Sequence, residues 1–208
     1  FPNVTIEHNY PFYNENDEKQ GEVDLLRIKR VIKYAYLPQY SCTVVAIPVK
    51  ENEPLNLVIV VPVAGAPTRT AIESFGKTFL GDLIDNIQES TKPVEVAIPR
   101  FQIETYHDNL QVVLERMGIT GIFTDPTAIE YVSQPPAVIG EYVQRIEVNL
   151  DLTGEDYREE EEECADEENV PLQEIRNKYV FNKPFIFTLM NTNTRACIFA
   201  GAYSKPSP

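Results

Sequence analysis

The last quarter of the chain places a long acidic segment between stretches that have the character of β-strands. Before the segment, residues 145–149 alternate between polar and apolar side chains, and apolar runs resume after it at residues 180–187 and 198–201. Alternation with a period of two is typical of a strand with one buried face. The order therefore predicts a strand, a long exposed loop and a closing pair of strands.

The acidic segment carries most of the charge of the protein. Residues 151–168 contain eleven acidic residues and one basic residue, which is a net charge of −10 out of −14 for the whole chain. Such a segment cannot bury enough apolar surface to order itself, so we expect a solvated loop. It lacks the alternating Asp/Asn spacing and the turn glycine of an EF-hand, which favours a solvated loop over a calcium site.

Outside this segment the pattern is rich in strands. Apolar and β-branched runs at residues 22–33, 42–49 and 55–61 predict strands, and their near-continuous apolar character predicts strands that are covered on both faces. Residues 70–88 change to steps of three and four, which predicts two short helices. The fold class is therefore mixed α/β and strand-rich.

Further along the chain, the alternation in residues 94–103 changes phase at Pro99, which predicts a β-bulge. Asp108 is a suitable N-cap for a short helix that ends at Gly118. The side chains expected on the buried side of this helix are Leu110, Val113, Leu114 and Met117. Residues 191–194 are expected to form a hairpin turn.

Several classes of function are disfavoured by the sequence. The net charge of −14 argues against nucleic acid and against an anionic membrane as partners, since both require clustered Lys and Arg. No catalytic serine, phosphate-loop or zinc-protease motif surrounds His8 or His107, so we expect neither an enzyme nor a metal or other cofactor. Arg100 is expected to be a surface charge.

The three cysteines are too few and too scattered for a disulfide framework or a zinc site. Cys42 and Cys197 lie in apolar runs and are expected to be small core residues. Cys164 lies within the acidic segment and is expected to be an exposed thiol.

Four passages, in order, resemble the serpin family. Residues 97–104 read A-I-P-R-F-Q-I-E and are followed by M-G-I-T at 117–120 and by Phe123, which is similar to the serpin passage L-P-K-F-x-I-E, a helix, and L-G-I-T-x-x-F. Residues 34–62 resemble consecutive central strands of that family, and residues 10–12 resemble the end of a long strand that usually reads W-x-x-P-F. The resemblance covers residues 1–208 and implies the C-terminal part of a single serpin-like domain. An N-terminal portion of the same fold is then an expected partner.

The resemblance implies that residues 150–174 are the equivalent of the serpin reactive loop. In inhibitory serpins a protease cleaves this loop and remains attached while the loop inserts into the main sheet as a new strand. Inhibitors carry a hinge similar to E-E-G-T followed by small residues, and here only Thr153 matches. The hinge positions are Leu150, Asp151, Leu152, Thr153 and Gly154. In addition, His8 stands where the family usually has Trp, and Tyr142 stands where it usually has His.

Insertion of this loop would be costly. Alternate residues of an inserted strand face the core, so at least two acids of residues 155–163 would be buried without partners, each at a cost on the order of several kcal/mol. Behaviour as a substrate or a non-inhibitor is therefore favoured. Counting forward from residue 149 places a bait bond near Asp166 and Glu167, whereas counting back from residue 181 places it near Gln173 and Glu174.

Taken with the resemblance, these features predict a secreted, extracellular serpin-like protein that is non-inhibitory and acts as a carrier or interaction protein. Asn3 begins a glycosylation sequon, which is meaningful in a secreted protein. The expected partner is a basic protein, a protease or a small hydrophobic ligand. The acids expected to bind a protein partner are Glu159, Glu160, Glu161, Glu162 and Glu163. The alternative is a serine protease inhibitor that uses the loop as bait and its acidic part to dock on a basic exosite.

Overall fold

The computed structural model of the chain describes residues 4–50, 53–62, 67–75, 85, 87–151 and 178–206. Within these ranges the chain forms two compact units, one from residues 1–101 and 150–208 and the other from residues 102–149. The mixed, strand-rich α/β class expected from the sequence is confirmed. None of the described helices is long and apolar enough to cross a lipid bilayer.

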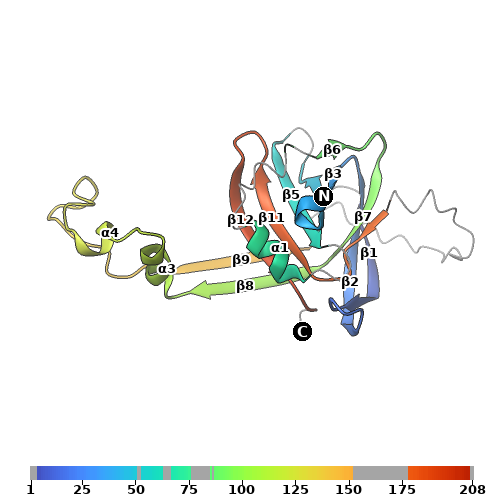
Figure 1. The fold of residues 1–208 in the computed structure, drawn as a ribbon, viewed down its shortest axis with the longest axis horizontal. Helices are drawn as coiled ribbons and strands as arrows, with labels where there is room; N and C mark the ends of the chain where they lie inside the picture. The colour runs from blue at the N-terminus through green and yellow to red at the C-terminus, as the bar shows by residue number, and fades with distance from the viewer. Residues whose placement is uncertain are drawn as a thin grey trace, which may run out of the picture. The chain divides into compact units, whose positions relative to one another are not determined.

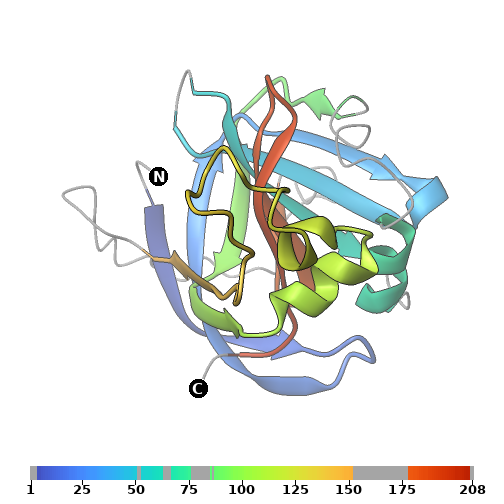
Figure 2. The ribbon, with the colours of Figure 1, turned by 90° about the vertical axis from the view of Figure 1, so that its left-hand side faces the viewer.

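A four-stranded sheet belongs to the first unit, with strand order β1-β2-β7-β10. Its strands are β1 (Val4–Tyr13), β2 (Lys19–Arg30), β7 (Val94–Pro99) and β10 (Lys178–Val180). The first three pair antiparallel, whereas β10 pairs parallel to β7. In Figure 2, β1 and β2 run side by side as a long blue ribbon. The β1–β2 register shifts between Glu7 and Tyr10, which places a bulge at His8 and Asn9.

A six-stranded sheet completes this unit, with strand order β12-β11-β5-β4-β3-β6 (Figure 1). Its strands are β3 (Lys33–Leu37), β4 (Cys42–Pro48), β5 (Leu55–Pro62), β6 (Gln88–Glu89), β11 (Phe185–Asn191) and β12 (Ala196–Tyr203), and a short 3₁₀ turn, Pro38–Tyr40, joins β3 to β4. Most side chains of β4 and β5 are buried on both faces, as their continuous apolar character predicts. Helix α1 (Thr68–Phe75) packs against β5 and β11. The expected turn between β11 and β12 is confirmed.

Aromatic side chains join the two sheets of the first unit. The ring of Tyr203 stacks on the rings of Phe101 and Phe185, with centroid distances of 5.0 Å and 5.4 Å. It lies perpendicular to the ring of Phe12, at a centroid distance of 5.3 Å. The rings of Phe187 and Phe101 are also in contact, with a centroid distance of 5.2 Å. All five side chains are buried, so strands that are far apart in the sequence share one core.

The second unit, residues 102–149, has very little core of its own. It contains the paired strands β8 (Phe101–His107) and β9 (Gln144–Leu150) with helices α3 (Leu110–Arg116) and α4 (Gly121–Thr124). Phe123 is the one buried side chain of these 48 residues, all of which the structure describes. Large apolar side chains are exposed instead, among them Met117 at 70%, Tyr131 at 97% and Val132 at 86%.

Two expectations for the second unit fail. Helix α3 begins after Asn109 rather than Asp108, with no side-chain cap, and none of its residues is buried, because so few elements surround it. Of the four residues expected on the buried side of the helix, Val113 and Met117 are exposed, whereas Leu110 and Leu114 are half-buried. Gly118 does adopt the left-handed conformation that ends the helix, with φ of 88°.

Two expectations for the first unit also need correction. Pro99 does not form a bulge; it ends β7, and from Phe101 the chain continues as β8 in a different sheet. Proline has no amide hydrogen for a sheet, which suits the last position of a strand. Cys42 is buried as expected, but Cys197 is exposed, because it lies on the edge strand β12.

Gly201 on β12 has no room for a side chain. A Cβ atom at this position would lie 2.6 Å from Cζ of Phe187, whose ring is fixed in the aromatic core. We expect Gly201→Ala to lower the free energy of unfolding by about 1–3 kcal/mol, measured by urea denaturation. Gly140→Ala is the control, because a Cβ atom there would meet nothing within 4 Å. Equal stability of the two variants would contradict the packing described here.

Candidate functional site

The structure describes the two points at which the acidic segment leaves the fold and returns to it. Leu150 and Asp151 are the described hinge residues, and Lys178 begins β10 at the other end. The remaining expected site residues lie outside the described ranges. These residues are Leu152, Thr153, Gly154, Glu159, Glu160, Glu161, Glu162, Glu163, Asp166, Glu167, Gln173, Glu174 and the sequon residue Asn3.

At the first of these points, Asp151 forms a two-pronged ion pair with Arg100. Nε of Arg100 lies 2.7 Å from Oδ1 of Asp151, and Nη2 donates a hydrogen bond of 2.7 Å to Oδ2. The fork of a guanidinium matches a carboxylate in this geometry, which is stronger than a single contact. Arg100 itself directly follows β7, where its backbone N–H donates to the carbonyl of Asp24 on β2 at 2.7 Å. The residue expected to be a simple surface charge therefore binds the hinge.

The bulge of β1 lies beside this anchor. Nδ1 of His8 is 3.1 Å from Oδ2 of Asp24, and the backbone N–H of Asn9, with φ of 57°, donates to Oδ1 of Asp24 at 3.3 Å. The carboxylate of Asp24 thus binds the bulge, while its backbone carbonyl accepts the hydrogen bond from the N–H of Arg100. His8 is therefore linked to the hinge residue Asp151 by three successive contacts, through Asp24 and Arg100.

At the second point, β10 is held by parallel pairing with β7, in which Lys178 lies opposite Glu95. Nζ of Lys178 is 3.6 Å from Oε1 of Glu95. Glu95 also pairs with Arg27 on β2, and Arg27 pairs with Glu7 on β1. Charges of alternating sign therefore cross all four strands of this sheet, from Glu7 to Lys178.

Arg27 is the centre of this row of charges, and its side chain is only 12% exposed. Burial acts to lower the pKa of the guanidinium, but hydrogen bonds and charges from Glu7 and then Glu95 outweigh burial and raise the pKa. The arginine is consequently held as a cation between two carboxylates. Both ends of the acidic segment thus connect to β7, one through Arg100 and the other through β10.

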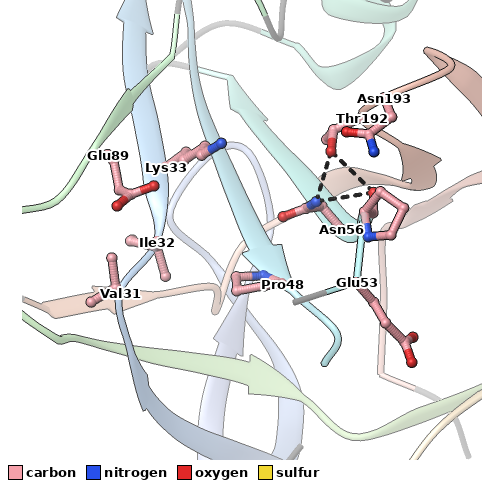
Figure 3. Close-up of a pocket in the computed structure, with 10 residues that line it drawn as sticks. Val31, Ile32, Lys33, Pro48, Glu53, Asn56, Glu89, Thr192 and Asn193 are labelled. Atoms are coloured by element: carbon pink, nitrogen blue, oxygen red, sulfur yellow. Dashed lines mark hydrogen bonds between the residues drawn. The ribbon is translucent and has the colours of Figure 1, made fainter. Parts of the chain in front are cut away.

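A pocket of about 390 Å³ lies at one end of the six-stranded sheet (Figure 3). It is lined by side chains from the starts of β3 and β5, the end of β4, strand β6 and the β11–β12 turn. The lining includes Ile32, Lys33, Pro48, Asn56, Glu89 and Thr192. None of them belongs to the acidic segment, and no local sequence pattern predicts that these residues lie together.

Two observations concern metal ligands and thiols in the described part of the chain. Its residues contain no group of three or more His, Cys, Asp or Glu side chains placed to hold a metal ion. Burial raises the pKa of the Cys42 thiol to about 11, so this thiol stays protonated at neutral pH.

The comparisons with known proteins agree with this arrangement of strands. Residues 3–206 match the family model described as serpin (serine protease inhibitor). This chain belongs to the serpin family. The match covers nearly the whole sequence and confirms the resemblance inferred from the four passages.

Three similar proteins show the range of the family. A leukocyte elastase inhibitor from Xenopus tropicalis is 24% identical over 92% of this chain and 50% of its own length. The corticosteroid-binding globulin of Mesocricetus auratus is 34% identical over 55% of this chain and 27% of its own length. A thyroxine-binding globulin solved in complex with thyroxine superposes with a TM-score of 0.70 at 16% identity, covering 98% of this chain and 51% of that one. This serpin chain spans about half the length of the leukocyte elastase inhibitors and of that globulin.

The row of charges across the four-stranded sheet makes a testable contribution to stability. We expect Glu95→Gln to lower the free energy of unfolding by about 1–2 kcal/mol, because Arg27 and Lys178 both lose a charged partner. Hydrogen exchange of the β10 amides should also become faster. Both quantities are measured by urea denaturation and exchange followed by mass spectrometry.

Glu22→Gln is the matched control for Glu95→Gln. Glu22 lies on β2 of the same sheet and pairs with Lys19 at 2.8 Å, but both side chains are about half exposed, at 48% and 52%. Exposed pairs contribute little, so the loss should be clearly smaller and β10 exchange unchanged. Equal effects of the two substitutions would refute a special role for Glu95.

Proposed function

We propose that this serpin-family protein is secreted, does not inhibit proteases by loop insertion, and binds a basic protein through its acidic segment. The observation that carries the proposal is the charge of that segment, −10 over residues 151–168. An inserted strand would carry several of these carboxylates into a packed sheet, where each unpaired charge is costly. The energetic drive for insertion is then reduced or reversed.

The anchor at Asp151 supports the same proposal. Insertion requires the hinge to move as a strand next to β9, whereas Asp151 is held by two hydrogen-bonded contacts to Arg100. Bidentate pairs of this kind resist separation more than single contacts do. With the second end fixed by β10, the acidic segment is presented from a rigid base.

The alternative is a serine protease inhibitor that uses residues 150–174 as bait, with Glu159–Glu163 docking on a basic exosite. Membership of a family that includes leukocyte elastase inhibitors favours this reading. Neither Asp166–Glu167 nor Gln173–Glu174 offers the Arg or Lys that a trypsin-like specificity pocket binds. An inhibitor of that class is therefore the weaker candidate.

Two further partners belong to the proposal. An N-terminal portion of the same fold would cover the exposed apolar side chains of residues 102–149, and the matched leukocyte elastase inhibitors are about twice as long as this chain. A small ligand is suggested by the thyroxine complex of the similar globulin. The pocket in Figure 3 is lined by both polar and apolar groups, so a purely hydrophobic ligand fits it poorly.

A panel of serine proteases tests the non-inhibitory assignment. We expect cleavage between Asp151 and Lys178 to give two fragments on a denaturing gel without a covalent complex, and the melting temperature to change little. Replacing Glu155, Asp156 and Glu159–Glu163 by Ala removes the charges that oppose insertion, so this variant should gain more thermal stability on cleavage. A stable complex, or a rise of tens of degrees in the unsubstituted protein, would establish the inhibitor instead.

The salt dependence of association tests the role of the acidic segment. With cytochrome c as a basic probe, the association rate should fall steeply as salt is raised through about 0.1 M, where charges are screened beyond about 10 Å. Replacing Glu159–Glu163 by Gln should remove most of this dependence. The control replaces five scattered acids by Gln, namely Glu18, Glu53, Glu115, Glu130 and Glu141, which removes the same number of charges. The idea fails if both variants lose the salt dependence equally.

A further inference from the structure

We propose that the pocket at the end of the six-stranded sheet binds a small zwitterion, a molecule that carries an ammonium and a carboxylate group on an apolar frame. This site lies outside the acidic segment and does not depend on the function proposed for it. Its volume of about 390 Å³ is within the usual range of small-molecule pockets, about 300–1,000 Å³.

The walls of the pocket are held in place by hydrogen bonds to the backbone. On one side, the Ile32 N–H donates to Oγ of Ser90 at 3.1 Å, and the Ser90 N–H donates back to the Ile32 carbonyl at 2.8 Å. Nη1 of Arg30 donates to the Pro48 carbonyl at 2.7 Å and so fixes the end of β4. The site is therefore formed before any ligand enters, which lowers the cost of binding.

On the opposite wall, hydrogen bonds fix the orientation of the side-chain amide of Asn56. Nδ2 of Asn56 donates to the Pro54 carbonyl at 3.3 Å and to Oγ1 of Thr192 at 3.4 Å. The Thr192 N–H and hydroxyl also donate to the Pro54 carbonyl, at 2.8 Å and 3.1 Å. Because the Asn56 amide nitrogen is engaged on this side, its carbonyl oxygen points the other way, toward Pro48 (Figure 3). An acceptor with a fixed orientation therefore faces the cavity.

Lys33 and Glu89 supply charges of opposite sign. They lie opposite each other in the β3–β6 pair and both line the pocket. Among the described residues, neither side chain has a hydrogen bond or an ion pair. In Figure 3 the ammonium of Lys33 extends toward the side of the pocket that carries Asn56. Glu53 is different, since Nζ of Lys50 pairs with its carboxylate at 2.9 Å.

The apolar part of the lining suits the carbon frame of such a zwitterion. Ile32 is buried, and Pro48 and Pro54 add further apolar surface. A purely apolar ligand would remove water from Lys33, Glu89 and the Asn56 oxygen without replacing it. A simple anion would satisfy Lys33 alone. A zwitterion places its carboxylate at Lys33 and its ammonium at Glu89 or the Asn56 oxygen, while its carbon frame covers the apolar surface.

Calorimetric titration with ligands of equal length tests the assignment. The probes are 6-aminohexanoate, hexanoate and hexylamine, with 4-aminobutanoate and its singly charged analogues as a shorter set. We expect at least one zwitterion to bind about tenfold tighter than either singly charged analogue, because each end adds a charge-assisted hydrogen bond. No binding of either zwitterion, or equal binding within each set, would overturn the proposal.

Two variants assign the two ends of the ligand. Lys33→Gln should reduce the affinity for the zwitterion to that for the amine and leave the amine unaffected, whereas Glu89→Gln should weaken the amine and the zwitterion but not the carboxylate. Lys92→Gln and Glu130→Gln are the charge-matched controls, since both residues are exposed and neither lines the pocket. If the controls weaken binding as much as the pocket variants do, the effect is general electrostatics and the site is disproved.

Discussion

The parallel pairing of β10 with β7 is the contact on which the organisation of this serpin chain depends. It returns the chain to the four-stranded sheet after the acidic segment, and it brings Lys178 to Glu95 and so to the buried cation Arg27. From β10 the chain enters β11, whose aromatic side chains fill the core shared by both sheets. Without this pairing, the second anchor of the acidic segment would have no fixed position, whereas the closing hairpin is held separately by the pairing of β11 with β5.

Electrostatics distinguishes the paired charges of the four-stranded sheet from the unbalanced charge of the acidic segment. Within the four-stranded sheet, carboxylates are balanced by Arg27 and Lys178, and at the hinge Asp151 is balanced by Arg100. The acids that follow Asp151 have a single base among them, Arg158. An unpaired charge is costly inside a sheet, and this cost is the reason why we propose that the acidic segment does not insert.

The exposed apolar side chains of residues 102–149 have a physical cause in the size of that unit. Two strands and two short helices cannot enclose a core, and Phe123 is the only buried side chain among these fully described residues. The first unit behaves differently, because β4 and β5 are covered on both faces. The sequence shows the helical periodicity of α3. Periodicity predicts which residues lie on the same face of the helix, but it does not predict which other elements cover that face.

The sequence by itself determined most of the strands, the left-handed turn at Gly118, the burial of Cys42 and membership of the serpin family, because alternation, left-handed turns and family motifs are local patterns. Only the tertiary structure decided that Arg100 binds the hinge, that Cys197 lies on an open edge, and that Lys33, Asn56 and Glu89 share a pocket. These outcomes depend on contacts between residues that are far apart in the chain. Ion pairs and pocket walls of this kind follow from strand order and register, for which a single sequence contains no local signal.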